Sequence, residues 1–139
     1  MSSNLVRCSL SIESTLFNQL ERLVGHNGYE NRSEYVRDLI RKQLVEEEWE
    51  SNEEALGTIT MIYDHETRNL GRNLVNLQHE NHDLFLATTH VHLDKHVCAE
   101  MIMLKGAAHD IRVVANNLGK QKGVLHTALS MSSTGKILK

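Results

Sequence analysis

Residues 84–105, LFLATTHVHLDKHVCAEMIMLK, contain two apolar runs of strand length that are separated by a short polar stretch. This pattern predicts a β-hairpin with strands at about 84–92 and 97–105. The periodicities of the flanking sequence predict helices at about 66–80 and 107–118. They also predict one further strand on each side of the hairpin in the chain, at about 57–63 and 123–131. The resulting βαββαβ order is the ferredoxin-like arrangement, so we expect an α+β domain here.

A second, smaller pattern occupies the first 45 residues. Residues 5–12, LVRCSLSI, alternate with a period of two, which predicts a strand with one apolar face. Apolar residues at helical spacing follow in 16–24. Asn31 can then cap a second helix, with Glu34 completing a capping box. The order is strand, helix, helix.

So small a unit cannot close a hydrophobic core by itself. Two copies of the strand, paired across a dimer, would form a two-stranded ribbon with Arg7, Ser9 and Ser11 facing outward. Such a ribbon fits the major groove of DNA, and these side chains suit base edges. A surface edge strand with one polar face explains the same alternation about equally well.

Charge is distributed unevenly along the chain. Residues 46–56 carry six glutamates and no basic residue, while the rest of the chain has a small basic excess, so this segment accounts for the net charge of −3. Neither flank has a strong basic excess, so we expect any DNA binding to be selective or conditional. We assign residues 1–48 to a DNA-binding domain and residues 57–133 to a second domain. Residues 49–56 between them are expected to form an acidic solvated linker, in which only Trp49 could pack. Residues 134–139 are expected to form a flexible tail.

The chain has no apolar segment that predicts membrane insertion or export. Its longest uninterrupted apolar runs have four residues, and the N-terminus lacks the apolar core of a secretory signal. We therefore expect a cytoplasmic protein without a membrane partner. Cys8 and Cys98 lie far apart in different contexts, so we expect no disulfide and a reduced Cys98.

Potential metal ligands are concentrated between residues 79 and 98. His90 and His92 are two apart on a predicted strand, so their imidazoles project from one face. Cys98 opens the next strand of the hairpin and returns its sulfur toward the same end. These three ligands can converge on one ion, and Glu100 could orient an imidazole from the same face.

His79 ends a predicted helix, and its route to the other ligands within one chain is not evident, although a neighbouring subunit could supply it. Three imidazoles and a thiolate suit Ni(II), Cu(II) or Zn(II). We assign the remaining nearby histidines to ordinary surface or core roles, with His96 as the nearest rival ligand: His82, His96, His109 and His126.

Several motifs occur in one order along the chain: RCSLS at 7–11, NRSE at 31–34, QHxxHDL at 78–84, HVHx5C at 90–98 and LKG at 104–106. Together they resemble the nickel-responsive transcriptional regulators of the NikR type over residues 5–131. The resemblance implies a ribbon-helix-helix dimerisation domain fused to an ACT-like regulatory domain. It also implies a homotetramer, a dimer of dimers with a DNA-binding dimer at each end.

The resemblance further implies one square-planar Ni(II) per subunit, held by His90, His92 and Cys98 of one subunit and His79 of another. In such proteins nickel enables tight binding to a palindromic double-stranded operator, which represses nickel uptake. By matching positions, the resemblance assigns base contacts to the ribbon residues Arg7, Ser9 and Ser11. It assigns phosphate contacts to the start of the second helix, at Asn31, Arg32 and Ser33. It assigns a second cation to the acidic residues Glu34 and Asp38.

The chain departs from the family pattern in two places. Ser9 and Ser11 stand where threonine is common, which removes methyl groups from the ribbon and changes the expected operator contacts. The stretch after His79 is E-N-H instead of a more histidine-rich run, so weaker accessory metal sites are reduced.

Two alternatives use the same residues. The first is a copper- or zinc-responsive regulator on the same scaffold, since divalent affinities generally peak at copper. The second is a metalloenzyme with Glu100 as its acid or base. Four strong ligands leave no open coordination position and no nucleophile is paired with a base, so we expect neither an enzyme nor a small organic substrate.

Overall fold

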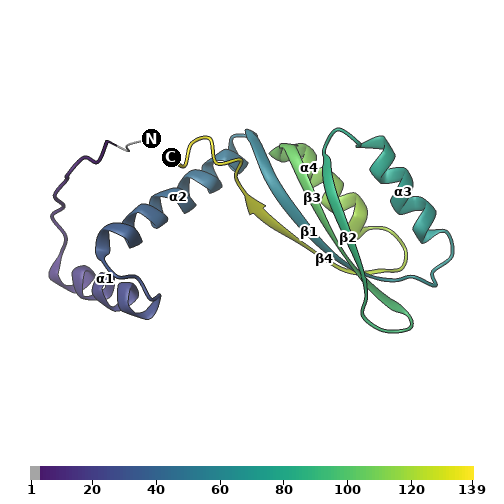
Figure 1. Ribbon diagram of the computed structural model, residues 1–139, viewed down its shortest axis with the longest axis horizontal. Helices are drawn as coiled ribbons and strands as arrows, with labels where there is room; N and C mark the ends of the chain where they lie inside the picture. Colours follow the sequence, from purple (N-terminus) through teal and green to yellow (C-terminus); the bar gives the residue numbers. More distant parts are fainter. Residues whose placement is uncertain (1–3) are drawn as a thin grey trace. The chain divides into compact units, whose positions relative to one another are not determined.

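The computed structural model describes residues 4–139 (Figure 1). The chain divides into two compact units, one ending at Ile40 and the other comprising Arg41–Lys139. No helix among the described residues combines the length and apolar character needed to cross a membrane.

The first unit contains α1 (Ser14–His26) and the beginning of α2 (Arg32–Glu50). The predicted cap of the second helix is confirmed, because Asn31 Oδ1 accepts the backbone N–H of Glu34 at 2.9 Å. This bond satisfies one of the donors that a helix N-terminus leaves unpaired. Arg32 joins the helices through an ion pair with Glu21 at 3.3 Å.

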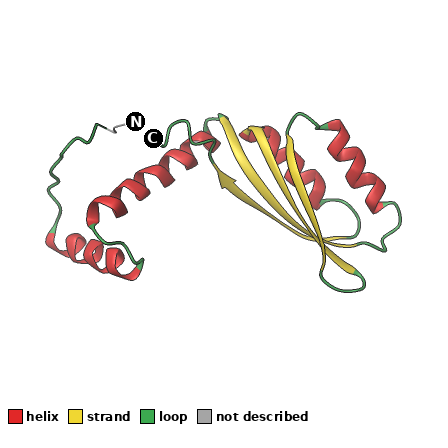
Figure 2. Cartoon of the chain, viewed as in Figure 1, coloured by secondary structure: helices red, strands yellow, loops and turns green. Residues whose placement is uncertain are grey.

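The strand predicted for residues 5–12 is not formed in the single chain, where residues 4–13 belong to no helix or strand (Figure 2). The physical reason is the lack of a partner, since a strand exists only by pairing and the described part of this unit contains no other. Leu5, Val6 and Leu10 are consequently 79%, 86% and 67% exposed. Exposed apolar surface of this kind is typical of interaction sites.

The acidic linker predicted for residues 49–56 is wrong. Helix α2 continues through Glu50, and strand β1 (Glu54–Asp64) begins after a short turn. Trp49 is only 4% exposed, and its indole Nε1–H donates to the backbone oxygen of Ser132 at 2.8 Å. The run of charges predicted solvation, but the helix turns Trp49 inward onto the sheet domain while most of the glutamates stay in solvent.

The second unit confirms the predicted strand and helix order. After β1 come α3 (Leu70–Glu80), β2 (Phe85–His92), β3 (Val97–Ala107), α4 (Ala108–Gly119) and β4 (Val124–Ser132). The four strands form one antiparallel sheet in the order β2-β3-β1-β4. Helix α3 begins later than predicted, because residues 65–69 form a turn that ends with Asn69 in the left-handed conformation (φ 66°).

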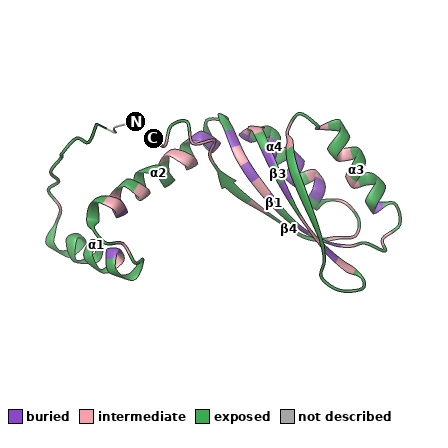
Figure 3. Ribbon diagram, in the orientation of Figure 1, coloured by how far each residue is buried: buried purple, intermediate pink, exposed green. Residues whose placement is uncertain are grey.

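The hydrophobic core lies between the sheet and the two helices α3 and α4 (Figures 1 and 3). Alternate residues of β1 point into it, as the period of a strand requires, and α4 supplies the facing side chains: Ala55, Ile59 and Met61 from β1, and Ile111, Val114 and Leu118 from α4. The other face of the sheet exposes Val91, Met101 and Met103 by 41–48%.

The C-terminal tail, for which the sequence predicted flexibility, makes two polar contacts within the second unit. Lys136 Nζ pairs with Glu54 Oε1 at 3.0 Å. Arg41 Nε donates to the backbone oxygen of Leu138 at 3.3 Å. The tail therefore returns to the part of the molecule where α2 ends and β1 begins (Figure 1).

Candidate metal centre

The hairpin of β2 and β3 positions three of the predicted ligands. In its antiparallel register His90 lies opposite Glu100, and His92 lies opposite Cys98. Opposite residues in a sheet project from the same face, so these four side chains gather on the side that carries the helices. The thiol sulfur of Cys98 lies 3.3 Å from Nδ1 of His92. Cys98 is fully buried, whereas both histidines are exposed.

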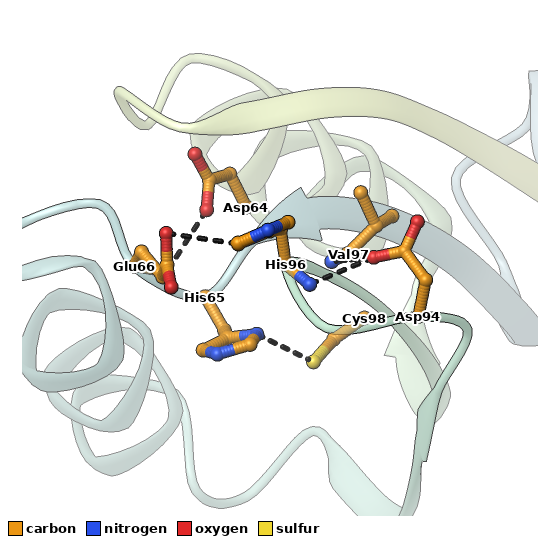
Figure 4. A network of polar contacts seen from close by, with 7 residues as sticks. All are labelled: Asp64, His65, Glu66, Asp94, His96, Val97 and Cys98. Carbon is orange, nitrogen blue, oxygen red and sulfur yellow. Dashed lines mark hydrogen bonds and ion pairs between the residues drawn. The ribbon is translucent and has the colours of Figure 1, made fainter.

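A histidine that the sequence analysis did not single out, His65, lies close to Cys98 and His92 and forms a three-ligand group with them. Nδ1 of His65 lies 3.5 Å from the sulfur of Cys98 (Figure 4). The ligand atoms of His65, His92 and Cys98 all lie within 4.8 Å of one another. His65 directly follows β1, whose last residue Asp64 pairs with Val97 of β3. The signal for His65 was thus the β1–β3 register, which a local motif search does not reveal.

Two loops are bound together next to His65 (Figure 4). The backbone N–H of His65 donates to the backbone oxygen of His96 at 3.0 Å, and the His96 side chain pairs with Glu66 at 3.0 Å. Asp94 Oδ1 accepts the N–H groups of His96 and Val97 at 2.7 and 2.8 Å. The imidazole of His96 therefore faces Glu66, and it is not part of the three-ligand group.

His90 has a neighbour on β1 that the sequence did not predict. Its ring centroid lies 4.9 Å from that of His92, but its Nδ1 lies 3.1 Å from the hydroxyl of Tyr63 on β1. Glu100 was expected to orient an imidazole. Glu100 lies opposite His90 in the β2–β3 register and interacts with it electrostatically, whereas the hydrogen-bond contact with His90 is made by Tyr63.

His79 is exposed in the last turn of α3 and is not among the clustered ligands of the single chain. His82, also exposed, pairs with its neighbour Asp83 at 2.9 Å. The absence of His79 from the group agrees with the difficulty of placing it within one chain.

A cavity of about 280 Å³ adjoins this cluster between α3 and the sheet. It is lined by apolar residues such as Leu74 and Phe85 together with the polar residues Tyr63, His90 and Glu100. The polar groups of the candidate centre therefore stand at the boundary between the hydrophobic core and the exposed end of the hairpin.

Burial governs the protonation of the centre. It raises the pKa of the Cys98 thiol, and the carboxylates of Asp94 and Glu100 raise it further. Burial also raises the pKa of Glu100, and with the charge of Glu100 it raises the pKa of Tyr63 to about 12. At neutral pH the metal-free centre consequently holds a protonated thiol and a neutral phenol, so a metal ion must displace the thiol proton.

The predicted DNA-contacting residues are accessible in the first unit. Arg7, Ser9 and Ser11 are exposed, as are Asn31, Arg32 and Ser33 at the start of α2. Cys8 is also exposed in the single chain. Of the two acidic residues assigned to a second cation, Asp38 accepts the hydroxyl of Tyr29 at 2.7 Å and Glu34 lies 3.9 Å from Arg37.

Comparison with known proteins places the chain in a family. Residues 56–132 match the model of the NikR C-terminal nickel-binding domain. A relative from Pyrococcus abyssi, named as a nickel-responsive regulator, is 47% identical to this chain over 97% of this chain and 99% of the relative. A relative of the same name from Solibacter usitatus is 44% identical over 99% of each protein. An uncharacterised Thermotoga maritima protein shares the fold of 57% of this chain and 98% of its own, with a TM-score of 0.52 and 16% identity.

Proposed function

Because the chain belongs to the NikR family of nickel-responsive regulators, a family of regulators and not of enzymes, we propose that it is a nickel-dependent DNA-binding repressor. The observation that carries the proposal is the convergence of imidazole and thiol groups at one end of the hairpin, with the sulfur of Cys98 3.3 Å from His92. Nitrogen and sulfur donors of this kind suit a borderline transition metal such as Ni(II).

The ligands that would hold nickel are His90, His92 and Cys98 of one subunit and His79 of another, with one ion per subunit. Nickel bound there would replace the thiol proton of Cys98 and join two subunits through His79. The exposure of His79 and its separation from the other ligands within one chain support a contribution from a neighbour. A metal held between subunits favours whichever packing of the subunits brings its ligands together.

A homotetramer would cover surface that the single chain leaves open. Val91, Met101 and Met103 form an exposed apolar group on the uncovered sheet face, and such groups are typical of protein interfaces. The exposed apolar residues of segment 5–12 would be covered separately, by pairing with the same segment of a second subunit. Two different apolar surfaces thus support a dimer of dimers.

The paired segments would form a ribbon-helix-helix unit that reads double-stranded DNA. Arg7, Ser9 and Ser11 would contact bases of a palindromic operator in the major groove, because a symmetric dimer presents the same residues to both half-sites. Asn31, Arg32 and Ser33 would meet phosphate at the start of α2. Glu34 and Asp38 would help to hold a second cation. The regulated genes would be those of nickel uptake, in the cytoplasm.

Selection of duplexes from a random library tests the proposal without knowledge of the operator. The Ni(II)-loaded protein should enrich a palindromic sequence, and the metal-free protein should enrich none. Arg7→Ala should keep its nickel but lose this enrichment, whereas Cys98→Ala should lose both. Equal enrichment with and without Ni(II) would contradict the proposal.

A specific observation favours a second candidate, a zinc-responsive regulator. His65, His92 and Cys98 already lie within 4.8 Å of one another in one chain, and three such ligands with one more suit tetrahedral Zn(II). The absorption spectrum of the protein loaded with Ni(II) separates the candidates. A planar nickel-thiolate spectrum supports the first, and a tetrahedral one supports the second.

A further inference from the structure

Two overlapping sets of ligands meet at Cys98. One set contains His65 together with His92 and Cys98, and its ligand atoms are already close together. The other set contains His90 in place of His65, together with the same His92 and Cys98, and these three residues belong to the nickel site proposed above. Since His92 and Cys98 belong to both sets, the orientation of His90 decides which set a metal can use.

The orientation of His90 depends on Tyr63. The hydroxyl of Tyr63 lies 3.1 Å from His90 Nδ1, and the two rings meet edge to face with centroids 6.0 Å apart. Tyr63 is 6% exposed on β1, in the middle strands of the sheet, whereas His90 is exposed on the edge strand β2. The tyrosine is therefore the fixed partner, and the histidine is the one whose rotamer the contact restricts.

We propose that Tyr63 is a positioning residue that determines metal selectivity by presenting Nε2 of His90 to the ion. This inference rests on the proposed nickel function. When Nε2 of an imidazole binds a metal, Nδ1 carries the proton and needs an acceptor. The hydroxyl oxygen of Tyr63, 3.1 Å from Nδ1 of His90, is placed to accept a hydrogen bond from that N–H.

The hydroxyl of Tyr63 does not contact either histidine of the other ligand set. Cys98, the cross-strand neighbour of Tyr63, belongs to both sets, so any effect through Cys98 is common to both metals. His65 is held by its own backbone bond to His96, and no interaction of Tyr63 with His65 or His92 is present among the described residues. Removing the hydroxyl of Tyr63 should therefore weaken a site that uses His90 and spare a site that uses His65. A difference between metals, and not a general loss of binding, is the expected signature.

The test is Tyr63→Phe, which keeps the ring and removes only the hydroxyl. Ni(II) affinity should fall roughly 10- to 100-fold, as is typical when the partner of a metal-binding histidine is removed. Zn(II) affinity should change by less than about threefold on the same grounds. Tyr29→Phe is the matched control, because it removes a tyrosine hydroxyl bound to Asp38 in the other unit and should leave both affinities unchanged.

A second readout does not need metal. Long-range ¹H–¹⁵N NMR of the metal-free protein reports the state of each imidazole nitrogen, and Tyr63→Phe should shift Nδ1 of His90 while sparing His92. Unchanged Ni(II) affinity, increased Ni(II) affinity, or an equal loss of both metals would each overturn the inference. If the wild type binds no Ni(II) at all, the proposed function itself fails, so the two failures can be told apart.

Discussion

Gly57 lies where α2 meets the sheet domain, and replacing it with alanine should destabilise the protein. An added Cβ would stand 2.9 Å from Cγ2 of Ile111, 3.2 Å from Cη2 of Trp49 and 3.3 Å from Cδ1 of Leu129. These contacts come from α4, α2 and β4, three different elements. Ile111 and Trp49 are buried, so neither can move without displacing others.

The expected loss follows from two opposing effects. Overpacking a buried site costs about 1–3 kcal/mol. Replacing glycine in a strand recovers about 0.5–1 kcal/mol of backbone entropy. We therefore expect Gly57→Ala to lower the free energy of unfolding by roughly 1–2 kcal/mol. Urea unfolding of the metal-free protein, followed by the fluorescence of its single tryptophan, Trp49, measures this directly.

Gly71 provides the matched control. It lies in α3 with nothing within 4 Å of an added Cβ, so Gly71→Ala should be neutral or stabilising by up to about 1 kcal/mol. Ile111→Ala and Gly57→Ala together should cost less than the sum of the two single substitutions, because Ile111→Ala removes Cγ2, the atom that the added Cβ crowds. A Gly57→Ala protein as stable as the wild type would refute the close packing of α2 on the sheet.

Three further predictions concern charge and capping. Ni(II) affinity should rise about tenfold per pH unit over the range in which the raised pKa of Cys98 keeps its thiol protonated. Asp94→Asn, which removes one cause of that raised pKa, should increase Ni(II) affinity at pH 7. Calorimetric titration at several pH values measures both effects, and a Ni(II) affinity that does not change with pH would contradict them. The pKa of Tyr63 is raised from 10.0 to about 12, so its contribution to the free energy of unfolding is complete below pH 10 and is lost as the pH rises toward 12. Tyr63→Phe should therefore lose less stability than the wild type between pH 10 and 12. An equal loss of stability in both proteins over this range would contradict the prediction. Asn31→Ala removes the bond to the N–H of Glu34 and should cost about 1 kcal/mol in thermal unfolding, whereas no change in midpoint would mean that the cap contributes nothing.

Local pattern predicted the hairpin and its ligands because strand periodicity alone places His90, His92 and Cys98 on one face. It missed His65, which reaches Cys98 through the pairing of β1 with β3, more than thirty residues apart in sequence. Such long-range register depends on the whole sheet and leaves no local signal. It missed Tyr63, whose hydroxyl contacts His90, for the same reason, since Tyr63 belongs to another strand.

Two other differences have separate causes. Trp49 was placed in a linker because glutamates surround it, although one large apolar side chain on a helix is enough to bury that helix end. The strand predicted at residues 5–12 is not formed in the single chain, where the described part of its unit offers no other strand to pair with. Its pairing with a second chain stays a prediction, which the exposed apolar surface of Val6 and Leu10 motivates.

Mixing two variants tests most directly whether the nickel site is shared between subunits. His79→Ala and Cys98→Ala proteins should each fail to bind Ni(II) tightly. When they are unfolded and refolded together in equal amounts, one of the two sites in each mixed pair regains a full set of ligands, so about a quarter of all sites should recover. The regained planar nickel-thiolate absorption is the measurement. No recovery on mixing, or tight Ni(II) binding by His79→Ala alone, would contradict a ligand contributed by a second subunit.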